Sequence, residues 1–246
     1  MNTWETQLRA LRAHVLRAAL VYAALACATG ACLPMVLRAA MRPVRALHLR
    51  LVATSLDEVV VQDLKLVLTV SLVAGAPYFL WEAWRFVAPG LTPGERRRAR
   101  ASVIAAFALF VCGAAFAWWL VVPRLVQYLS AIATWSHVEL YLRYASYVSF
   151  VSNVLVAFGL AFELPLAAGI ATSLGLLSPA SLRAKRRYAY FALVVVGVII
   201  SPPELIAHLS VTVPLFALYE LSIGVSAIVE RRSAKEQPSS PALEKG

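Results

Sequence analysis

Six apolar segments separated by short polar connections constrain the fold of this chain more than any other feature. They run over about residues 14–37, 64–87, 101–122, 146–175, 188–200 and 205–229. Within a lipid bilayer every backbone polar group must find a partner inside the protein, and a helix provides one within a single segment. About 20 apolar residues are enough to cross the bilayer as a helix. The sequence therefore predicts an all-α membrane protein with six transmembrane helices, forming one domain over residues 1–229.

The composition supports a membrane protein over a soluble one. The chain has 246 residues, is 61% hydrophobic and has a mean hydropathy of +0.73, whereas soluble domains are about 45–50% apolar. The net charge of +10 would indicate a nucleic-acid partner in a soluble protein. Here the charges lie in the connections between apolar segments, so we expect a lipid bilayer and no nucleic acid as a partner. The polar tail, residues 230–246, is predicted to be disordered.

The distribution of lysine and arginine predicts the orientation in the membrane. Two precede the first segment, four lie in each connection after segments two and four, and four lie in the tail, which makes fourteen on one side. The other side has six, spread over longer connections. Because cytoplasmic loops carry an excess of Lys and Arg, both termini are predicted to be cytoplasmic.

The fifth segment is short, and prolines interrupt two of the others. Residues 188–200 would form a helix of about 20 Å, whereas the hydrocarbon core is about 30 Å thick. Such a helix either thins the bilayer, is sheltered by neighbouring helices, or extends a few residues beyond these bounds. Pro77 and Pro165 fall inside segments two and four, where proline kinks a helix. We expect kinked helices that form a cup around a concave face.

Two carboxylates stand out by their position. Glu95 lies in the basic connection after segment two, next to Arg96 and Arg97. A carboxylate there can bind an incoming guanidinium or can simply neutralise its own arginine neighbours. Glu163 lies inside segment four, where an ionisable residue is costly and usually faces protein or water. It is either protonated and bonded to a neighbouring helix, or a polar contact point on the concave face.

Polar residues also gather around the last two apolar segments. Ser201, Glu204 and His208 surround the turn at Pro202-Pro203, and Tyr219 and Glu220 lie within segment six. Each of these two groups either forms contacts within the chain or binds a partner helix. The sequence has no HExxH, GxSxG, Walker A or GxGxxG motif and only isolated histidines. We therefore predict that the chain is not an enzyme and needs no metal or cofactor.

Several stretches in register resemble TatC, the large subunit of the twin-arginine protein translocase. The resemblance extends over about residues 5–225, and each motif alone would be weak. The matching stretches are Thr54-Ser55-Leu56-Asp57-Glu58, Phe86-Val87-Ala88-Pro89-Gly90-Leu91 with Glu95-Arg96-Arg97, the run from Ala157 to Pro165, Ser201-Pro202-Pro203-Glu204, and Leu218-Tyr219-Glu220.

The resemblance implies a receptor and scaffold subunit that binds twin-arginine signal peptides and helps move folded proteins across the bacterial inner membrane, driven by the proton motive force. The implied signal-peptide site contains Glu95, with Arg12 and Glu5 as further candidates. The implied partners are single-span subunits of the TatA and TatB types, twin-arginine precursor proteins and other copies of the chain. Partner contacts are expected at Glu163, Ser201, Glu204, His208, Tyr219 and Glu220.

Three positions depart from the family pattern. Ala10 stands where the family has a glutamate, Leu56 where it has a proline, and Glu204 where it has an aspartate. These changes leave open a specialised paralogue with weakened signal recognition. A small-molecule secondary transporter is the alternative from another class. It would predict internal repeats with paired broken helices, and the two halves of this sequence show no convincing repeat.

Overall fold

A computed structural model describes residues 3–47, 49–87, 93–136, 141–201 and 205–236 of the chain. Side chains are described over these ranges except for 3–8, 10, 87, 93–101, 205–206 and 233–236. The elements in chain order are α1 (Thr3–Ala31), α2 (Leu33–Ala40), α3 (Arg42–Ala46), β1 (Arg50–Val52), α4 (Leu56–Val87), α5 (Pro93–Phe116), η2 (Ala117–Val121), α6 (Val122–Trp135), β2 (Tyr141–Arg143), α7 (Tyr144–Ala161), α8 (Leu164–Ser173), α9 (Pro179–Ala184), α10 (Arg186–Ile200) and α11 (Leu205–Glu236).

Five helical stretches of the described chain are long and apolar enough to cross a membrane. They are Leu11–Ala31, Leu56–Phe86, Ser102–Trp135, Tyr144–Ser173 and Ala207–Arg232. The remaining predicted span, the fifth (residues 188–200), corresponds to α10, which has 15 residues. At 1.5 Å per residue it is about 22 Å long, so the short fifth span expected from the sequence is also short in the structure.

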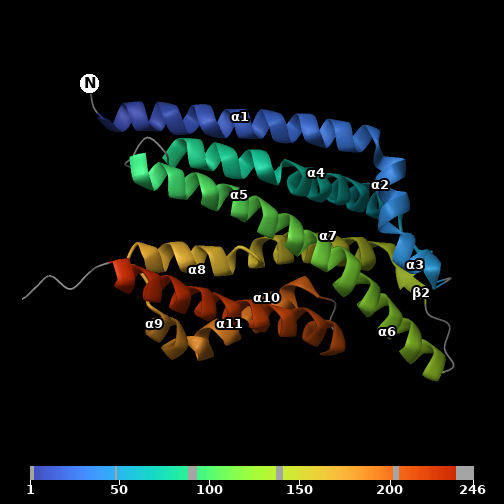
Figure 1. The fold of residues 1–246 in the computed structure, drawn as a ribbon. Coiled ribbons are helices and arrows are strands. Elements are labelled where there is room, and N and C mark those ends of the chain that lie inside the picture. Colours follow the sequence, from blue (N-terminus) through green and yellow to red (C-terminus); the bar gives the residue numbers. More distant parts are fainter. Residues whose placement is uncertain (1–2, 48, 88–92, 137–140, 202–204, 237–246) are drawn as a thin grey trace, which may run out of the picture.

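The long helices run between two ends of the molecule (Figure 1). The start of α1, the end of α4, the start of α5 and the end of α11 lie together at one end, which we call the arginine-rich end. Helices α2 and α3 and strand β2 lie at the opposite end, which we call the strand end. The connection that carries Arg96, Arg97 and Arg98 therefore lies at the same end as both termini of the described chain.

Helix α7 is the centre of the hydrophobic core. It contacts α4, α5, α10 and α11, and its side chains Val148, Val151, Val154 and Phe158 are almost completely buried. Helix α5 approaches α7 closely at Gly113, where an added Cβ would lie 2.3 Å from the carbonyl oxygen of Phe158. A residue without a side chain is therefore required at this crossing.

Prolines shape two of the long helical stretches. The predicted kink at Pro165 is present, because α7 ends at Ala161 and α8 begins at Leu164 with Pro165 in its first turn. At Pro123 the structure differs from the connection predicted over 123–145, because the chain stays helical to Trp135. A π-helix, Ala117–Val121, precedes Pro123, and proline is tolerated in the first turn of the helix that follows.

The C-terminal helix is longer than the sequence indicated. Helix α11 continues to Glu236, whereas the polar tail was predicted to begin at residue 230 and to be disordered. Charged residues such as Glu230 and Arg231 are exposed there and extend the helix beyond the apolar segment. Residues 237–246 lie outside the described part of the chain.

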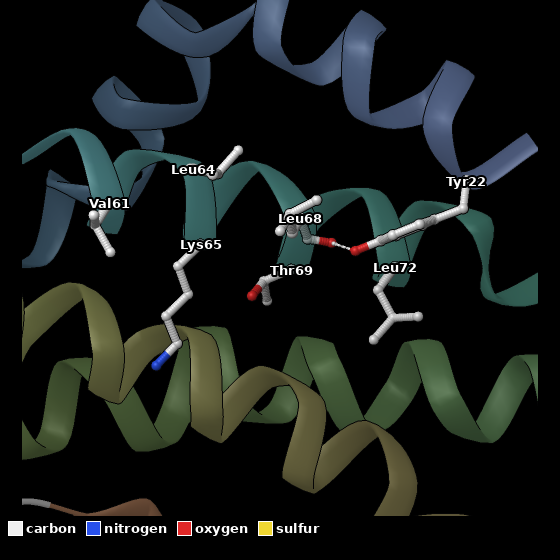
Figure 2. Close-up of a pocket in the computed structure, with 7 residues that line it drawn as sticks. All are labelled: Tyr22, Val61, Leu64, Lys65, Leu68, Thr69 and Leu72. Carbon is white, nitrogen blue, oxygen red and sulfur yellow. Dashed lines mark hydrogen bonds between the residues drawn. The ribbon is translucent and has the colours of Figure 1, made fainter. Parts of the chain in front are cut away.

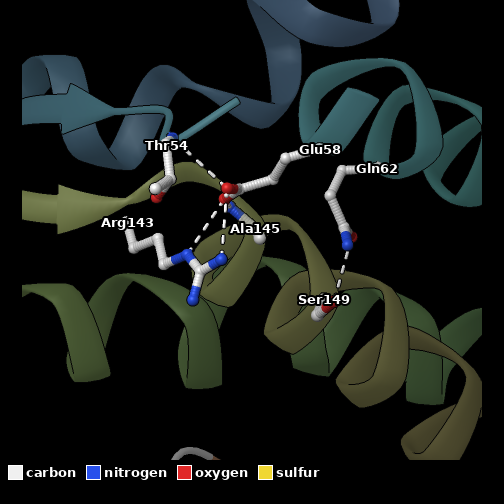
Figure 3. Close-up of polar contacts among 6 residues, drawn as sticks. All are labelled: Thr54, Glu58, Gln62, Arg143, Ala145 and Ser149. Atoms are coloured by element: carbon white, nitrogen blue, oxygen red, sulfur yellow. Dashed lines mark hydrogen bonds and ion pairs between the residues drawn. The ribbon is translucent and has the colours of Figure 1, made fainter. Parts of the chain in front are cut away.

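A short parallel sheet joins α4 and α7 at the strand end. Strand β1 pairs with β2, with Leu51 opposite Leu142. The Glu58 carboxylate accepts hydrogen bonds from Arg143 Nε at 3.1 Å and Nη2 at 3.2 Å, and from the Ala145 backbone N–H at 3.2 Å (Figure 3). The pairing with Glu58 raises the pKa of Arg143 above its ordinary value. This cluster fixes where α4 and α7 begin relative to each other.

Candidate functional site

The residues predicted to bind a signal peptide all lie near the arginine-rich end. Glu5 and Arg12 belong to α1, and Glu95 lies in the first turn of α5. Helix α1 packs against α4, and α4 packs against α5, so α4 holds the other two helices together at this end. The Arg12 side chain is exposed, whereas the side chains of Glu5 and Glu95 lie outside the described residues. The structure thus places the three positions at one end and gives no contact between them.

A third acid, Glu82, lies between α1 and α4 near this end. Its carboxylate is only 3% exposed and lies 2.7 Å from His14 Nδ1. Arg17 Nη1 lies 3.7 Å away and Arg85 Nη1 lies 3.4 Å away. Phe86 packs edge-on against the His14 ring, with 5.8 Å between the centroids. Glu82 therefore fastens the start of α1 to the end of α4 and is already paired with cations.

The turn between α10 and α11 brings two of its three predicted residues together. The Ser201 hydroxyl donates to the Gly197 carbonyl at 2.7 Å and is also hydrogen-bonded to His208 Nδ1. Ser201 is buried and His208 is partly exposed. Glu204 lies outside the described residues. The pair fastens the end of α10 to the first turns of α11, and His208 remains partly exposed.

Tyr219 and Glu220 join α11 to the segment that contains α9 and α10. Arg186 donates to both Glu220 oxygens, at 2.8 Å from Nε and 2.6 Å from Nη2. This pairing raises the pKa of Arg186 above its ordinary value. The Tyr219 hydroxyl donates to the Leu182 carbonyl at 2.9 Å. Of the two interpretations given above, these contacts support the structural one.

Glu163 lies at the break between α7 and α8. It occupies the N-cap position of α8, immediately before Leu164, and is partly exposed. Its Oε1 atom is buried, and no hydrogen-bond partner reaches that atom within the described part of the chain. The break in the helix therefore places a carboxylate oxygen at membrane depth with its bonding capacity unused.

Two hollows lie on the sides of the helix bundle, and both are lined by Lys65 and Thr69 of α4. The first has a volume of about 340 Å³ and lies beside Tyr22, whose hydroxyl donates to the Leu68 carbonyl at 3.1 Å (Figure 2). The second has a volume of about 610 Å³ and is lined by residues of α4, α7, α8, α10 and α11. Neither hollow contains the grouping of acid, base and nucleophile that catalysis would need.

The described residues include no group of three or more His, Cys, Asp or Glu that could hold a metal ion. What the arrangement offers chemically is ion pairing and hydrogen bonding with a partner. Carboxylates pair with arginines at both ends of the bundle, and isolated polar groups face the sides of an otherwise apolar bundle.

The sequence interpretation missed Glu58, Lys65 and Glu82 as site residues. Lys65 and Glu82 fall inside the predicted span 64–87, where an ionisable residue by itself marks a functional or paired position. That same rule singled out Glu163 and could have been applied to both. Glu58 belongs to a stretch quoted for the family resemblance, but its partner Arg143 is 85 residues away along the chain, so no local sequence feature indicated the pair.

Comparison with known proteins identifies the family. The model of the family described as Sec-independent protein translocase protein (TatC) matches residues 6–214. A Sec-independent protein translocase protein TatC from Listeria innocua is 36% identical over 167 residues, which is 68% of either chain. The protein of the same name from Halalkalibacterium halodurans is 41% identical over 159 residues, 65% of this chain and 63% of that relative.

A solved structure agrees with the sequence matches. The crystal structure titled as the twin-arginine translocase receptor TatC superposes with a TM-score of 0.82 and 27% identity, covering 91% of this chain and 99% of that one. This confirms the predicted fold class of a polytopic helical membrane protein. The matched family is one of protein translocase subunits and not a known enzyme family. With the family model covering most of the sequence and the fold shared along nearly its whole length, this chain belongs to the TatC family of Sec-independent protein translocase proteins.

Proposed function

We propose that the chain is the receptor and scaffold subunit of a twin-arginine translocase, and that it binds twin-arginine signal peptides at its arginine-rich end. The observation that carries this proposal is the superposition on a twin-arginine translocase receptor over 91% of the chain. The chain then helps to move folded proteins across the membrane with energy from the proton motive force. Residues 1–229 act as one membrane domain.

The arginine-rich end faces the cytoplasm in this proposal. Fourteen of the twenty loop and tail lysines and arginines counted above belong to the predicted cytoplasmic segments. The structure supports the grouping, because the start of α1, the end of α4, the start of α5 and the end of α11 lie at one end (Figure 1). By the positive-inside rule, the chain sits in the bacterial inner membrane with both termini in the cytoplasm.

Glu95 carries most of the signal recognition. The family's other acid is absent at Ala10, and Glu82 is already paired with arginines of α1 and α4. Glu95 lies in the first turn of α5, where the helix dipole favours a carboxylate, and a carboxylate can accept hydrogen bonds from a guanidinium. Arg12 and Glu5, on the neighbouring α1, contact the polar part of the signal.

The turn at Ser201 and His208, with Glu204, docks the single-span partner subunits of the TatA and TatB types. Ser201 and His208 are hydrogen-bonded at the end of the short α10, and the imidazole stays partly exposed. Glu163 adds a polar contact deeper in the bundle, and its unpaired Oε1 supports this role. Tyr219 and Glu220 hold α9 and α10 in place for these contacts. Other copies of the chain assemble beside it in the bilayer.

Binding of a synthetic twin-arginine signal peptide to the purified chain in nanodiscs tests the role of Glu95. Glu95→Gln keeps the shape and removes the charge, so binding should weaken about tenfold, the value of one charge-assisted hydrogen-bonded pair. Ala10→Glu restores the second acid and should tighten binding. Raising the salt concentration should reduce both differences.

Glu230→Gln is the matched control, because Glu230 is an exposed acid on α11 that is not among the residues proposed to bind the signal. It should bind the signal as the parent does. If Glu95→Gln also bound as the parent does at low salt, Glu95 would only neutralise Arg96 and Arg97, and the assignment of the recognition site would be wrong.

A further inference from the structure

Four exposed arginines lie at the strand end, and the proposed function gives them no role. Arg38 lies in α2, Arg42 and Arg45 lie in α3, and Arg50 begins β1. They are four of the six lysines and arginines counted above on the less basic side of the membrane. Because an excess of such residues normally marks the cytoplasmic side, this cluster on the opposite side needs a local explanation.

Three of these residues form one row, which we call the arginine stripe. Arg38, Arg42 and Arg45 are spaced by four and three residues, so they lie on one face of the helical stretch. The Arg45 backbone N–H donates to the Met41 carbonyl at 3.0 Å and continues the helical bonding from α2 into α3. Met41 and Val44 are buried against the bundle. Figure 1 shows α2 and α3 running across the strand end, at a steep angle to α1. Such an amphipathic helix is typical of the membrane interface.

The arginine stripe has no anion of its own among the described residues. None of its three side chains makes an ion pair or hydrogen bond with a residue that the structure describes. Two acids of α4 at this end are engaged elsewhere, because Glu58 pairs with Arg143 and Asp63 accepts a hydrogen bond from the Tyr144 hydroxyl. The stripe therefore presents three guanidinium groups to an anion from outside the chain.

A third hollow of the bundle, which we call the small hollow, lies beside the arginine stripe. It has a volume of about 270 Å³ and is lined by residues of α2, α4, η2 and α7. All of its lining residues are apolar, and they include Met35 and Ala39 of α2, Leu66 of α4 and Trp118 of η2. The Met35 side chain is 75% exposed, so the small hollow is accessible from outside the bundle.

The small hollow and the arginine stripe lie at successive depths in the membrane. Met35 lies within the first predicted apolar segment, 14–37, and Arg38 is the first residue after it. Leu66 is the third residue of the second apolar segment, 64–87. The small hollow is thus at the edge of the hydrocarbon region, and the guanidinium groups lie where the phosphates of the lipids begin.

We propose that the arginine stripe and the small hollow together bind one anionic phospholipid, with its phosphate at the arginines and an acyl chain in the hollow. A phospholipid has its charge and its apolar chain in this order of depth, and the arginine fork matches phosphate oxygens. A zwitterionic headgroup would bring its own cation to the arginines, so an anionic headgroup is favoured. In the proposed orientation this lipid belongs to the leaflet away from the cytoplasm. The proposal does not depend on signal-peptide recognition.

The size of the small hollow favours an acyl chain over a helix of a partner protein. One helical turn, about 10 Å across and 5.4 Å long, takes up roughly 420 Å³. The small hollow has about 270 Å³, which admits a thinner chain. A soluble acidic peptide would pair with the arginines and leave the apolar hollow unfilled. A phospholipid satisfies both the charge and the apolar surface.

The test measures lipid contact at the small hollow in the full-length chain in phosphatidylcholine nanodiscs. The native cysteines are replaced by alanine, and Met35→Cys carries a bimane fluorophore. Dibrominated phosphatidylglycerol or dibrominated phosphatidylcholine is added at the same mole fraction and quenches the fluorophore on contact. The relative affinity should favour phosphatidylglycerol about fivefold or more, the effect of about one basic residue beside anionic lipid. A bimane at Leu20→Cys, exposed on α1 and outside the hollow, should be quenched equally by both lipids.

Charge variants test the arginine stripe. Arg38→Gln, Arg42→Gln and Arg45→Gln together should bring the preference for phosphatidylglycerol to about one, whereas lysine at the same three positions should keep most of it. The matched control is Arg231→Gln with Arg232→Gln, because these two arginines are exposed at the other end of the molecule, near the end of α11. The control should leave the preference unchanged.

A filled hollow tests the acyl chain. Ala39→Phe places a ring in the small hollow and should reduce quenching by the brominated chains at Met35→Cys. Ala46→Phe, at an exposed position of α3 outside the hollow, should leave the quenching unchanged. Millimolar glycerol phosphate at constant ionic strength should not displace the brominated phosphatidylglycerol, because it has no chain to fill the hollow.

Equal quenching by the two lipids at Met35→Cys would overturn the proposal. So would a preference for phosphatidylglycerol that is as large at Leu20→Cys or that survives the triple glutamine variant, because a general surface charge would then cause it. Unchanged quenching in Ala39→Phe, or displacement by glycerol phosphate, would show that the arginines bind an anion without an acyl chain in the hollow, and would likewise overturn it.

Discussion

At the scale of single residues, three acids of this chain differ in what their surroundings let them do. Glu82 is buried and paired with His14 and Arg85, so it holds two helices together. Glu163 has an oxygen without a partner in the described residues, and Glu95 lies in the first turn of α5 at the arginine-rich end. Their positions in the sequence were enough to identify Glu163 and Glu95 as candidate site residues. Glu82 was not identified in this way, because its pairing with side chains of α1 depends on α1 and α4 lying side by side.

The pairing of Glu82 predicts a loss of stability when its charge is removed. Glu82→Gln removes the negative charge that pairs with Arg17 and Arg85, so the unfolding temperature of the detergent-solubilised protein should fall by about 2–4 °C. Differential scanning fluorimetry measures this unfolding temperature. Glu230→Gln, at an exposed position, should unfold at the parent's temperature. An unchanged melting temperature for Glu82→Gln would show that the cluster does not hold α1 in place.

At the scale of elements, the apolar segments and prolines predicted most of the helices, and the break beside Pro165 appears as expected. Two boundaries differ. Helix α6 continues through residues predicted as a connection, because the π-helix accommodates Pro123, and α11 extends to Glu236. The short strands β1 and β2 could not be predicted from three-residue runs, because their pairing depends on contacts 91 residues apart, as between Arg50 and Tyr141.

The crossing of α5 and α7 predicts opposite outcomes for two glycines. At Gly113 an added Cβ would lie 2.3 Å from the Phe158 carbonyl oxygen, so Gly113→Ala should push the helices apart and cost about 1–3 kcal/mol. At Gly224 nothing lies within 4 Å, so Gly224→Ala should be neutral or stabilise α11 by up to about 1 kcal/mol. Thermal unfolding compares the two. Equal stabilities would mean that the crossing is looser than described.

At the scale of the whole molecule, the charge pattern and the fold indicate the same orientation in the membrane. The predicted cytoplasmic segments meet at the arginine-rich end, and the network around Glu58 lies at the strand end (Figure 1, Figure 3). This orientation could be predicted from the sequence because the charges of each loop can be counted without knowing the fold. The small hollow could not be predicted in this way, because that surface needs side chains from helices far apart in the chain.

Cysteine labelling tests the orientation in intact cells. Cys27, Cys32 and Cys112 are first replaced by alanine, since all three are exposed and unpaired. Ser239→Cys, in the tail, should then react with a membrane-impermeant maleimide only after the cells are opened. Trp135→Cys, 88% exposed at the end of α6, should react in intact cells. The reverse labelling pattern would show that the topology is the opposite of the one predicted.

The most direct test of the central claim is a photo-cross-link between a signal peptide and the arginine-rich end. A photoreactive residue replaces Arg98 in one variant and Trp135, at the end of α6, in another. With a precursor that carries the twin-arginine signal, the adduct should form at position 98 and not at 135. A twin-lysine signal, which cannot bind bidentately, should give a much weaker adduct. An adduct that forms equally with both signals, or forms only at position 135, would contradict twin-arginine recognition at this end of the chain.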